Sequence, residues 1–219
     1  VMNAHQKASI GNALIKKTMA LYYDVPEDFE ELVYKGLVLQ GFGIRHGIEA
    51  HRRNRPYCMG SLYWQLNDSW PVVSWSSIDY YGNWKAMHYQ GKRAFAPILL
   101  NAFKEGDDLC IYTLSDELQT MKNATLQLKV MNFDGKVLNS KLVKGEVPAN
   151  ASVVYCKENY EALAKSGEYS VKFLLLLAKL LMFQEKTNTP NAYMFKKLLS
   201  QLKDCPCIFE IISTATHHR

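Results

Sequence analysis

The spacing of apolar residues in this 219-residue chain changes character near residue 96. Before that point helical spacing dominates, and it predicts helices over residues 12–22, 26–54 and 84–95. Between the last two helices, Tyr57–Gln65 has the composition of one buried strand. A helix, a strand, a long loop and a second helix in this order are typical of the closing units of a βα-barrel.

Beyond Pro97 the chain is predicted to form an all-β domain. Apolar and polar residues alternate well in Leu126–Val130, and Asp134-Gly135 is typical of a tight hairpin turn. Short strands at such spacing indicate a β-sandwich of the immunoglobulin type. The strands that we expect are Ile98–Lys104, Leu109–Leu114, Thr125–Asn132, Val137–Val143, Ser152–Lys157 and Tyr169–Leu177.

All four tryptophans of the chain fall in one stretch, between Trp64 and Trp84. Short polar side chains, among them Asn67 and Asp68, lie between them. A wall of rings that carries hydrogen-bonding groups suits a sugar, because a pyranose offers an apolar C–H face and a polar set of hydroxyls. A buried aromatic corner, whose indole N–H groups need partners, is the structural alternative.

The residues around these tryptophans carry a family resemblance. The run Gly60–Asp68, followed by Trp70-Pro71, Ser74–Ser77 and Asp79–Ala86, resembles the β-mannosidases of glycoside hydrolase family 2. The resemblance extends on both sides of this run, and past residue 95 it thins to a few positions. These further positions are Gln6, Gly11-Asn12, Tyr23, Val25-Pro26, Phe29, Gln40, Glu49–Arg53, His88-Tyr89, Pro190-Asn191, Tyr193 and Phe195.

The resemblance implies a fold class and a division of the chain. The fold class is α/β plus all-β, with terminal units of a (β/α)8 barrel followed by an immunoglobulin-like β-sandwich. Residues 1–96 would be the C-terminal portion of the barrel and residues 97–195 the sandwich. Residues 196–219 would be a linker and the start of a truncated further β domain. There, Ile208–Ile212 is predicted to be a lone strand with unpaired edges.

The resemblance also implies a function. The chain is expected to be a C-terminal fragment of an exo-acting retaining β-mannosidase, which hydrolyses terminal non-reducing β-D-mannose residues. Its partners would be β-mannoside oligosaccharides and the remainder of its own barrel, and no cofactor is expected. The alternative is a noncatalytic carbohydrate-binding or interaction module, with the aromatic stretch as its ligand surface.

The predicted substrate-binding residues are Trp64, at the end of the last expected barrel strand, and Asn67, Asp68 and Trp70, which follow that strand. Loops at the C-terminal ends of strands build the active site of such a barrel. The resemblance implies that the Trp64 ring forms part of the wall at the mannosyl-binding subsite, where Asn67 and Asp68 hold the wall or contact hydroxyls. A loop or helix cap is the alternative for Asp68, and loop packing is the alternative for Trp70. Trp84, at a helix start, is expected to be structural.

The carboxylates of the first region do not match a retaining catalytic pair, which needs two carboxyl groups about 5–5.5 Å apart. In the family that the chain resembles, both are glutamates at the ends of earlier barrel strands, and the acid/base follows an asparagine. The chain has no Asn-Glu pair, and its glutamates before residue 96 are Glu27, Glu30, Glu31 and Glu49, all on the expected helix 26–54. We therefore expect no catalytic residue in this chain, both glutamates upstream of Val1, and no activity from the fragment alone.

Binding of nucleic acid, a metal or a membrane is not expected. The net charge is only +5, and the basic residues of 45–55 suit the last turns of a helix better than a nucleic-acid patch. Cys205-Pro206-Cys207 has no second pair at the spacing of a zinc site. The apolar run Phe173–Phe183 is shorter than the roughly 20 residues of a membrane-spanning helix. Val1–Gln6 lacks a signal-peptide pattern, so the compartment stays open, although the resemblance implies a periplasmic, secreted or lysosomal parent.

Overall fold

The structure, a computed structural model, describes residues 1–131, 136–165 and 208–213. The chain divides into two compact units, Val1–Leu99 and Leu100–Arg219. The predicted hairpin turn at Asp134-Gly135, the predicted strand Tyr169–Leu177 and the apolar run Phe173–Phe183 lie outside the described residues. Within the described ranges, every helix is too short or too polar to cross a membrane.

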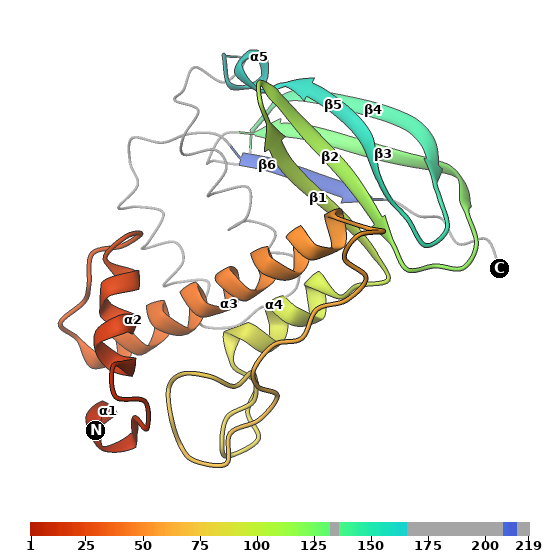
Figure 1. Cartoon of the computed structure of the whole chain (residues 1–219). Helices are drawn as coiled ribbons and strands as arrows, with labels where there is room; N and C mark the ends of the chain where they lie inside the picture. Colours follow the sequence, from red (N-terminus) through yellow and green to blue (C-terminus); the bar gives the residue numbers. More distant parts are fainter. Residues whose placement is uncertain (132–135, 166–207, 214–219) are drawn as a thin grey trace. The chain divides into compact units, whose positions relative to one another are not determined.

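The first unit is built from helices (Figure 1). They are α1 (Met2–His5), α2 (Gly11–Met19), α3 (Phe29–Arg53) and α4 (Ala86–Ala94). The three helices predicted from apolar spacing are therefore confirmed, with ends that differ by a few residues. α3 starts after Asp28, whose carboxylate accepts a hydrogen bond from the Glu31 N–H at 2.8 Å. This contact satisfies one of the N–H groups that a helix start leaves without an internal partner.

A glycine allows α3 and α4 to pack closely. Gly41 is buried, and a Cβ atom at that position would lie 3.2 Å from backbone atoms of Ala86 and Met87 at the start of α4. Gly43 and Gly47, on the same helix, have open space where a Cβ would stand. A side chain at Gly41 would therefore be tight against α4, whereas the other two positions have room for one.

Arginines of α3 are buried beside α4 and do not form a basic surface. Arg45 Nε lies 2.5 Å from Glu49 Oε1, and both side chains are buried. Arg52 Nη1 donates to the carbonyls of Ala94 at 2.5 Å and Ala96 at 2.9 Å, at the C-terminal end of α4. We expected this basic cluster to serve the last turn of its own helix. Arg52 instead serves the neighbouring helix end, where exposed carbonyls carry the negative end of the helix dipole.

The strand predicted over Tyr57–Gln65 is wrong for this chain: the segment has no regular secondary structure. Its described backbone hydrogen bonds go to Asn54, at the end of α3, and to Ser77. A barrel strand receives its backbone partners from strands on both sides. No strand precedes β1 in residues 1–99, so the segment has nothing to pair with and no barrel is formed here.

The second unit is a β-sandwich, as predicted. It contains β1 (Ile98–Glu105), β2 (Asp108–Ser115), β3 (Met121–Met131), β4 (Val137–Val147), β5 (Ser152–Asn159), α5 (Tyr160–Lys165) and β6 (Ile208–Ser213). These strands form two three-stranded sheets, β1-β2-β5 and β4-β3-β6 (Figure 1). β2 pairs with β5, and β3 with β4, in antiparallel register.

The core of this unit lies on the alternate positions that the sequence indicated. Leu126, Leu128 and Val130 of β3 are all at most 3% exposed, which confirms the alternation predicted for that strand. Strands of both sheets and α5 contribute to one apolar cluster. Its buried members are Leu109, Ile111, Leu126, Val130, Cys156, Tyr160 and Leu163.

The last described strand does not stand alone. β6 pairs with β3, from Ser213 opposite Leu126 to Ile208 opposite Met131. The expectation of a lone strand at Ile208–Ile212 is therefore wrong. A free edge of β3 would leave unpaired N–H and C=O groups, and a strand that pairs with this edge satisfies them.

Candidate functional site

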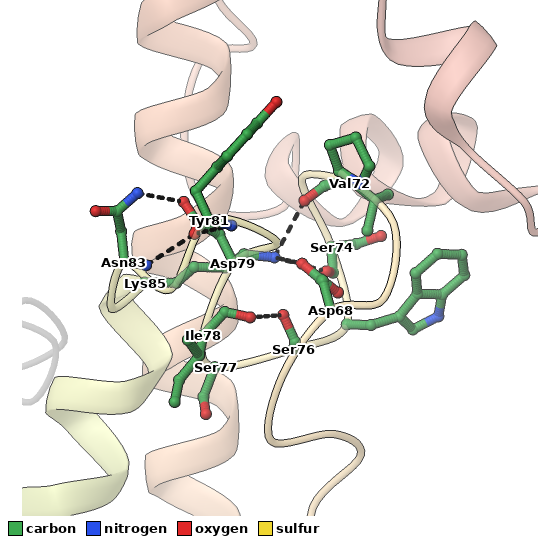
Figure 2. Close-up of polar contacts among 12 residues, drawn as sticks. Asp68, Val72, Ser74, Ser76, Ser77, Ile78, Asp79, Tyr81, Asn83 and Lys85 are labelled. Carbon is green, nitrogen blue, oxygen red and sulfur yellow. Dashed lines mark hydrogen bonds and ion pairs between the residues drawn. The ribbon is translucent and has the colours of Figure 1, made fainter.

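A buried ion pair organises the segment of residues 63–85, which we call the aromatic loop. Lys85 Nζ lies 2.5 Å from Asp68 Oδ2 and donates to the carbonyls of Val72 and Ser74, both at 3.1 Å (Figure 2). An ammonium has three hydrogens to donate, and these three acceptors match them. Both side chains are buried. Lys85 therefore joins the start of α4 to the middle of the loop.

Ser77 forms a second centre of hydrogen bonds and is fully buried. Its N–H donates to the Gln65 carbonyl at 2.9 Å, and its own carbonyl accepts from the Lys85 N–H at 2.9 Å. Its Oγ donates to the Leu66 carbonyl at 2.9 Å and lies 3.2 Å from the Tyr63 hydroxyl. The same Oγ lies 3.1 Å from His88 Nδ1 on α4. Ser77 thus connects the beginning of the loop, its end and α4.

The tip of the loop is a turn closed by Asp79. One carboxylate oxygen accepts from the N–H groups of Tyr81 and Asn83 at 2.8 Å each, and the other accepts from the Asn83 side-chain amide at 3.0 Å (Figure 2). Gly82 has φ +88°, a conformation that glycine adopts without strain. Burial opposes ionisation of Asp79, but hydrogen bonds from Asn83 and Tyr81 hold the pKa of its carboxyl below the ordinary value.

Of the four predicted substrate-binding residues, Trp64 and Asn67 are exposed and Asp68 is buried. The Trp64 side chain is 76% exposed, and the peptide bond to Gln65 is cis. Asp68 is 5% exposed, with Oδ2 bound to Lys85 and Oδ1 without a hydrogen-bond partner among the described residues. In this chain the Asp68 carboxylate therefore supports the loop from inside, and a ligand on the surface does not reach it.

The Trp70 ring is partly covered by the N-terminal segment. Lys7 Nζ lies 4.3 Å from the ring centroid, and the His5 ring lies 5.9 Å from it. His5 Nδ1 donates to the Pro71 carbonyl at 2.6 Å, which fixes the imidazole beside Trp70. A cation over an aromatic face is itself a favourable contact. Trp70 therefore has structural neighbours on one side, although 45% of it stays exposed.

The Trp84 ring packs on α4, the helix that follows it. It lies 4.1 Å from the His88 ring and 5.3 Å from the Tyr89 ring, centroid to centroid. It is nevertheless 44% exposed. Its neighbour in the cluster, Trp75, has φ +60°, and its carbonyl accepts from the Gln40 side chain at 3.0 Å.

Five carboxylates of the first unit are engaged in structural contacts. Asp28 caps α3, Glu31 pairs with Lys35 on the helix surface, and Glu49 pairs with Arg45 inside. Asp68 is held by Lys85, and Asp79 by its turn. No group of three or more metal-ligating side chains occurs in the part of the chain that the structure describes. The arrangement is suited to presenting rings to a ligand, and the carboxylates within the aromatic loop, Asp68 and Asp79, are both held by the loop itself.

Comparisons with known proteins agree on one family. A model described as the mannosidase Ig/CBM-like domain matches residues 107–198. The β-mannosidase of Capra hircus is 37% identical over 119 residues, which are 48% of this chain and 14% of that protein. The β-mannosidase of Mus musculus is 27% identical over 218 residues, 91% of this chain and 24% of that protein. The crystal structure of a β-D-mannosidase from Dictyoglomus thermophilum matches 73% of this chain with a TM-score of 0.68 and 38% identity.

The chain is similar to the β-mannosidases of glycoside hydrolase family 2. It matches their C-terminal part and spans only 14% and 24% of the two mammalian relatives, and 20% of the Dictyoglomus structure. An exo-chitosanase from Amycolatopsis orientalis shares the fold, with a TM-score of 0.55 at 24% identity over 67% of this chain and 17% of that one. The family match over the second unit confirms the immunoglobulin-like sandwich.

Two central residues of the aromatic loop were missed from the sequence. We singled out neither Lys85 nor Ser77, because their importance lies in contacts between distant parts of the loop. One signal was available for Lys85. Between Arg55 and Lys85 the only charged residues are Asp68 and Asp79, so Lys85 is the first cation that follows the two acids in the sequence. A buried acid needs such a partner.

Proposed function

We propose that the chain is a segment of an exo-acting retaining β-mannosidase, and that its aromatic loop forms part of the wall of the mannosyl-binding subsite. The Trp64 ring would lie against the apolar face of the sugar. The observation that carries this proposal is the exposure of a large ring, 76%, on a loop that is held from inside by the Lys85–Asp68 pair. An indole ring offers an apolar face that a sugar can cover and an N–H that can donate a hydrogen bond.

In this proposal residues 1–96 are the closing units of a (β/α)8 barrel, and Tyr57–Gln65 becomes the last strand when the remaining strands are present. Apolar side chains of that segment support this. Tyr57, Met59 and Leu62 are 96%, 58% and 103% exposed, although the sequence gives them the character of a buried strand. The remainder of the barrel would cover them and supply the missing backbone partners.

Residues outside this chain would carry the catalytic step. Retaining hydrolysis needs a nucleophile and an acid/base about 5–5.5 Å apart. The carboxylates of Glu49, Asp68 and Asp79 are held in structural contacts. We therefore propose that this chain binds sugar weakly and does not hydrolyse β-mannosides by itself.

A titration of the 219-residue chain with mannose and mannobiose tests the site. The indole N–H signals in NMR spectra report the binding. We expect binding in the millimolar range, with the largest shift at Trp64 and a loss of binding in Trp64→Ala. Leu118→Ala, at an exposed position of the second unit, is the control. Equal mannose affinity in Trp64→Ala and the unmodified chain would rule out the sugar wall. If the chain hydrolyses an aryl β-mannoside and Glu49→Gln abolishes that activity, the proposal that residues outside this chain carry the catalytic step is wrong.

The second candidate is a noncatalytic carbohydrate-binding module. The description of the matched family model as Ig/CBM-like favours it. The two candidates differ in how binding depends on the rest of the barrel. A free-standing module would bind mannobiose equally well with or without an added polypeptide that carries the missing strands, whereas a barrel segment would bind more tightly when they are present.

A further inference from the structure

Both neighbours of Trp64 in the sequence are attached to Ser77. The Tyr63 hydroxyl lies 3.2 Å from Ser77 Oγ, and the Gln65 carbonyl accepts from the Ser77 N–H at 2.9 Å. Ser77 is fully buried, whereas Trp64 is 76% exposed. The exposed ring is therefore carried by a backbone that one buried residue holds on both sides.

The position of the Ser77 hydroxyl hydrogen follows from its partners. Ser77 Oγ lies 2.9 Å from the Leu66 carbonyl oxygen, which can only accept a hydrogen bond. Two oxygens at this distance repel each other unless a hydrogen lies between them, so the Ser77 hydroxyl donates to Leu66. Its one hydrogen is then used, and Oγ can only accept from the Tyr63 hydroxyl and from His88 Nδ1.

This assignment fixes the state of His88. Because Ser77 Oγ accepts at 3.1 Å, His88 carries a hydrogen on Nδ1. The His88 ring also lies 4.1 Å from the Trp84 ring. Ser77 is therefore connected to two rings of the aromatic loop, to Trp64 through Tyr63 and to Trp84 through His88.

We propose that Ser77 and Tyr63 are positioning residues for the Trp64 ring, and that His88 completes the set as its Nδ1–H tautomer. The role given to the ring rests on the function proposed above. Loss of the Tyr63 hydroxyl would leave Ser77 Oγ with an empty acceptor site and would free one end of the three-residue segment that carries Trp64. The ring would then sample orientations that do not face the sugar.

Tyr63→Phe is the main test because it removes one oxygen and keeps the ring. We expect the order parameter of the Trp64 indole N–H to fall and the mannose dissociation constant to rise about two- to tenfold, the range for one hydrogen bond. Ser77→Ala should give the same changes or larger ones. Tyr22→Phe, on an exposed side chain of the same unit, is the matched control and should change neither quantity.

The outcomes separate the two proposals. Unchanged Trp64 relaxation and affinity in Tyr63→Phe would overturn the positioning role, even if Ser77→Ala fails to fold. Altered Trp64 relaxation in a chain that never binds mannose would support the positioning role and contradict the sugar site. Long-range proton–nitrogen correlations of the unmodified chain report the His88 tautomer directly, and a hydrogen on Nε2 alone would overturn that part of the proposal.

Discussion

Lys85 Nζ and Asp68 Oδ2 lie 2.5 Å apart inside the aromatic loop, and their side chains are 6% and 1% exposed. The pair joins two points of the chain that are separated by most of the loop. Two further carbonyls complete the contacts of the ammonium. A loop with so many exposed rings has little apolar core of its own. The buried Lys85–Asp68 pair, in place of such a core, gives the loop a defined shape.

Removal of the cation should destabilise the first unit strongly. Lys85→Met leaves the Asp68 carboxylate buried without its counter-ion, a change that typically costs about 3–5 kcal/mol. Urea unfolding followed by tryptophan fluorescence measures the loss, since all four tryptophans lie between Trp64 and Trp84. Lys17→Met, on the exposed side of α2, is the control. The double variant Lys85→Met with Asp68→Leu should recover part of the loss, and strict additivity would argue against the pair.

Substitution by alanine should have opposite effects on stability at Gly41, which contacts α4, and at Gly43, which does not. Gly41→Ala places a Cβ 3.2 Å from the backbone of α4 and should destabilise the first unit by about 1–3 kcal/mol, less the gain in helix propensity. Gly43→Ala meets open space and should stabilise it by about 0.5–1 kcal/mol. Thermal melts of both variants test this, and equal melting temperatures would show that α3 and α4 do not pack closely in solution.

Asp79 should make the stability of the loop depend on pH in the acidic range. Because hydrogen bonds hold the pKa of this carboxyl below its ordinary value in the folded chain, ionised Asp79 favours folding at neutral pH. That contribution is lost as the pH falls below about 4 and through the lowered folded pKa. The difference in melting temperature between the unmodified chain and Asp79→Asn should therefore be present at pH 7 and shrink toward pH 2. If this difference in melting temperature instead grows as the pH falls, the folded chain does not lower the pKa of Asp79.

The thiol of Cys156 should resist alkylation at moderate pH. Burial, together with the Glu158 carboxylate 3.3 Å from the sulfur, raises the pKa of this thiol to about 11. Roughly one molecule in a thousand then carries the thiolate at pH 8. Iodoacetamide labelling with peptide mass mapping should modify the half-buried Cys58 before Cys156, and labelling of Cys156 should rise about tenfold per pH unit up to pH 10. Labelling of Cys156 as fast as Cys58 at pH 8 would contradict the burial.

The elements that the sequence predicted correctly depend on local pattern. α3 is marked by its apolar spacing, and β3 by the alternation around Leu126, so short stretches of sequence were sufficient for both. Tyr57–Gln65 has an equally clear local pattern but no pairing partners in this chain. A strand is completed by residues far away in sequence, and its own composition cannot show whether they are present.

The candidate site divides in the same way. Trp64 could be proposed from sequence because the chemistry of a ring belongs to the residue itself. Asp68 could not be assigned, since a carboxylate can contact a sugar, cap a turn or pair with a cation. Its pairing with Lys85 is visible only in the structure, because the two residues are far apart in sequence and close in space. Ser77 resembles its neighbour Ser76 in sequence, and only the three-dimensional contacts separate their roles.

The contacts of Ser77 have a consequence for how this loop can vary in length. These hydrogen bonds close two shorter loops within the aromatic loop, one before Ser77 and one between Ser77 and α4. Residues inserted at the solvent-facing tip near Gly82 lengthen only the second of these shorter loops, at an entropic cost that grows slowly with length. A single residue inserted beside Ser77 would shift its hydroxyl away from all its partners together. Natural length variation should therefore gather at the tip, and the rings would keep their places while the turn beyond them changes.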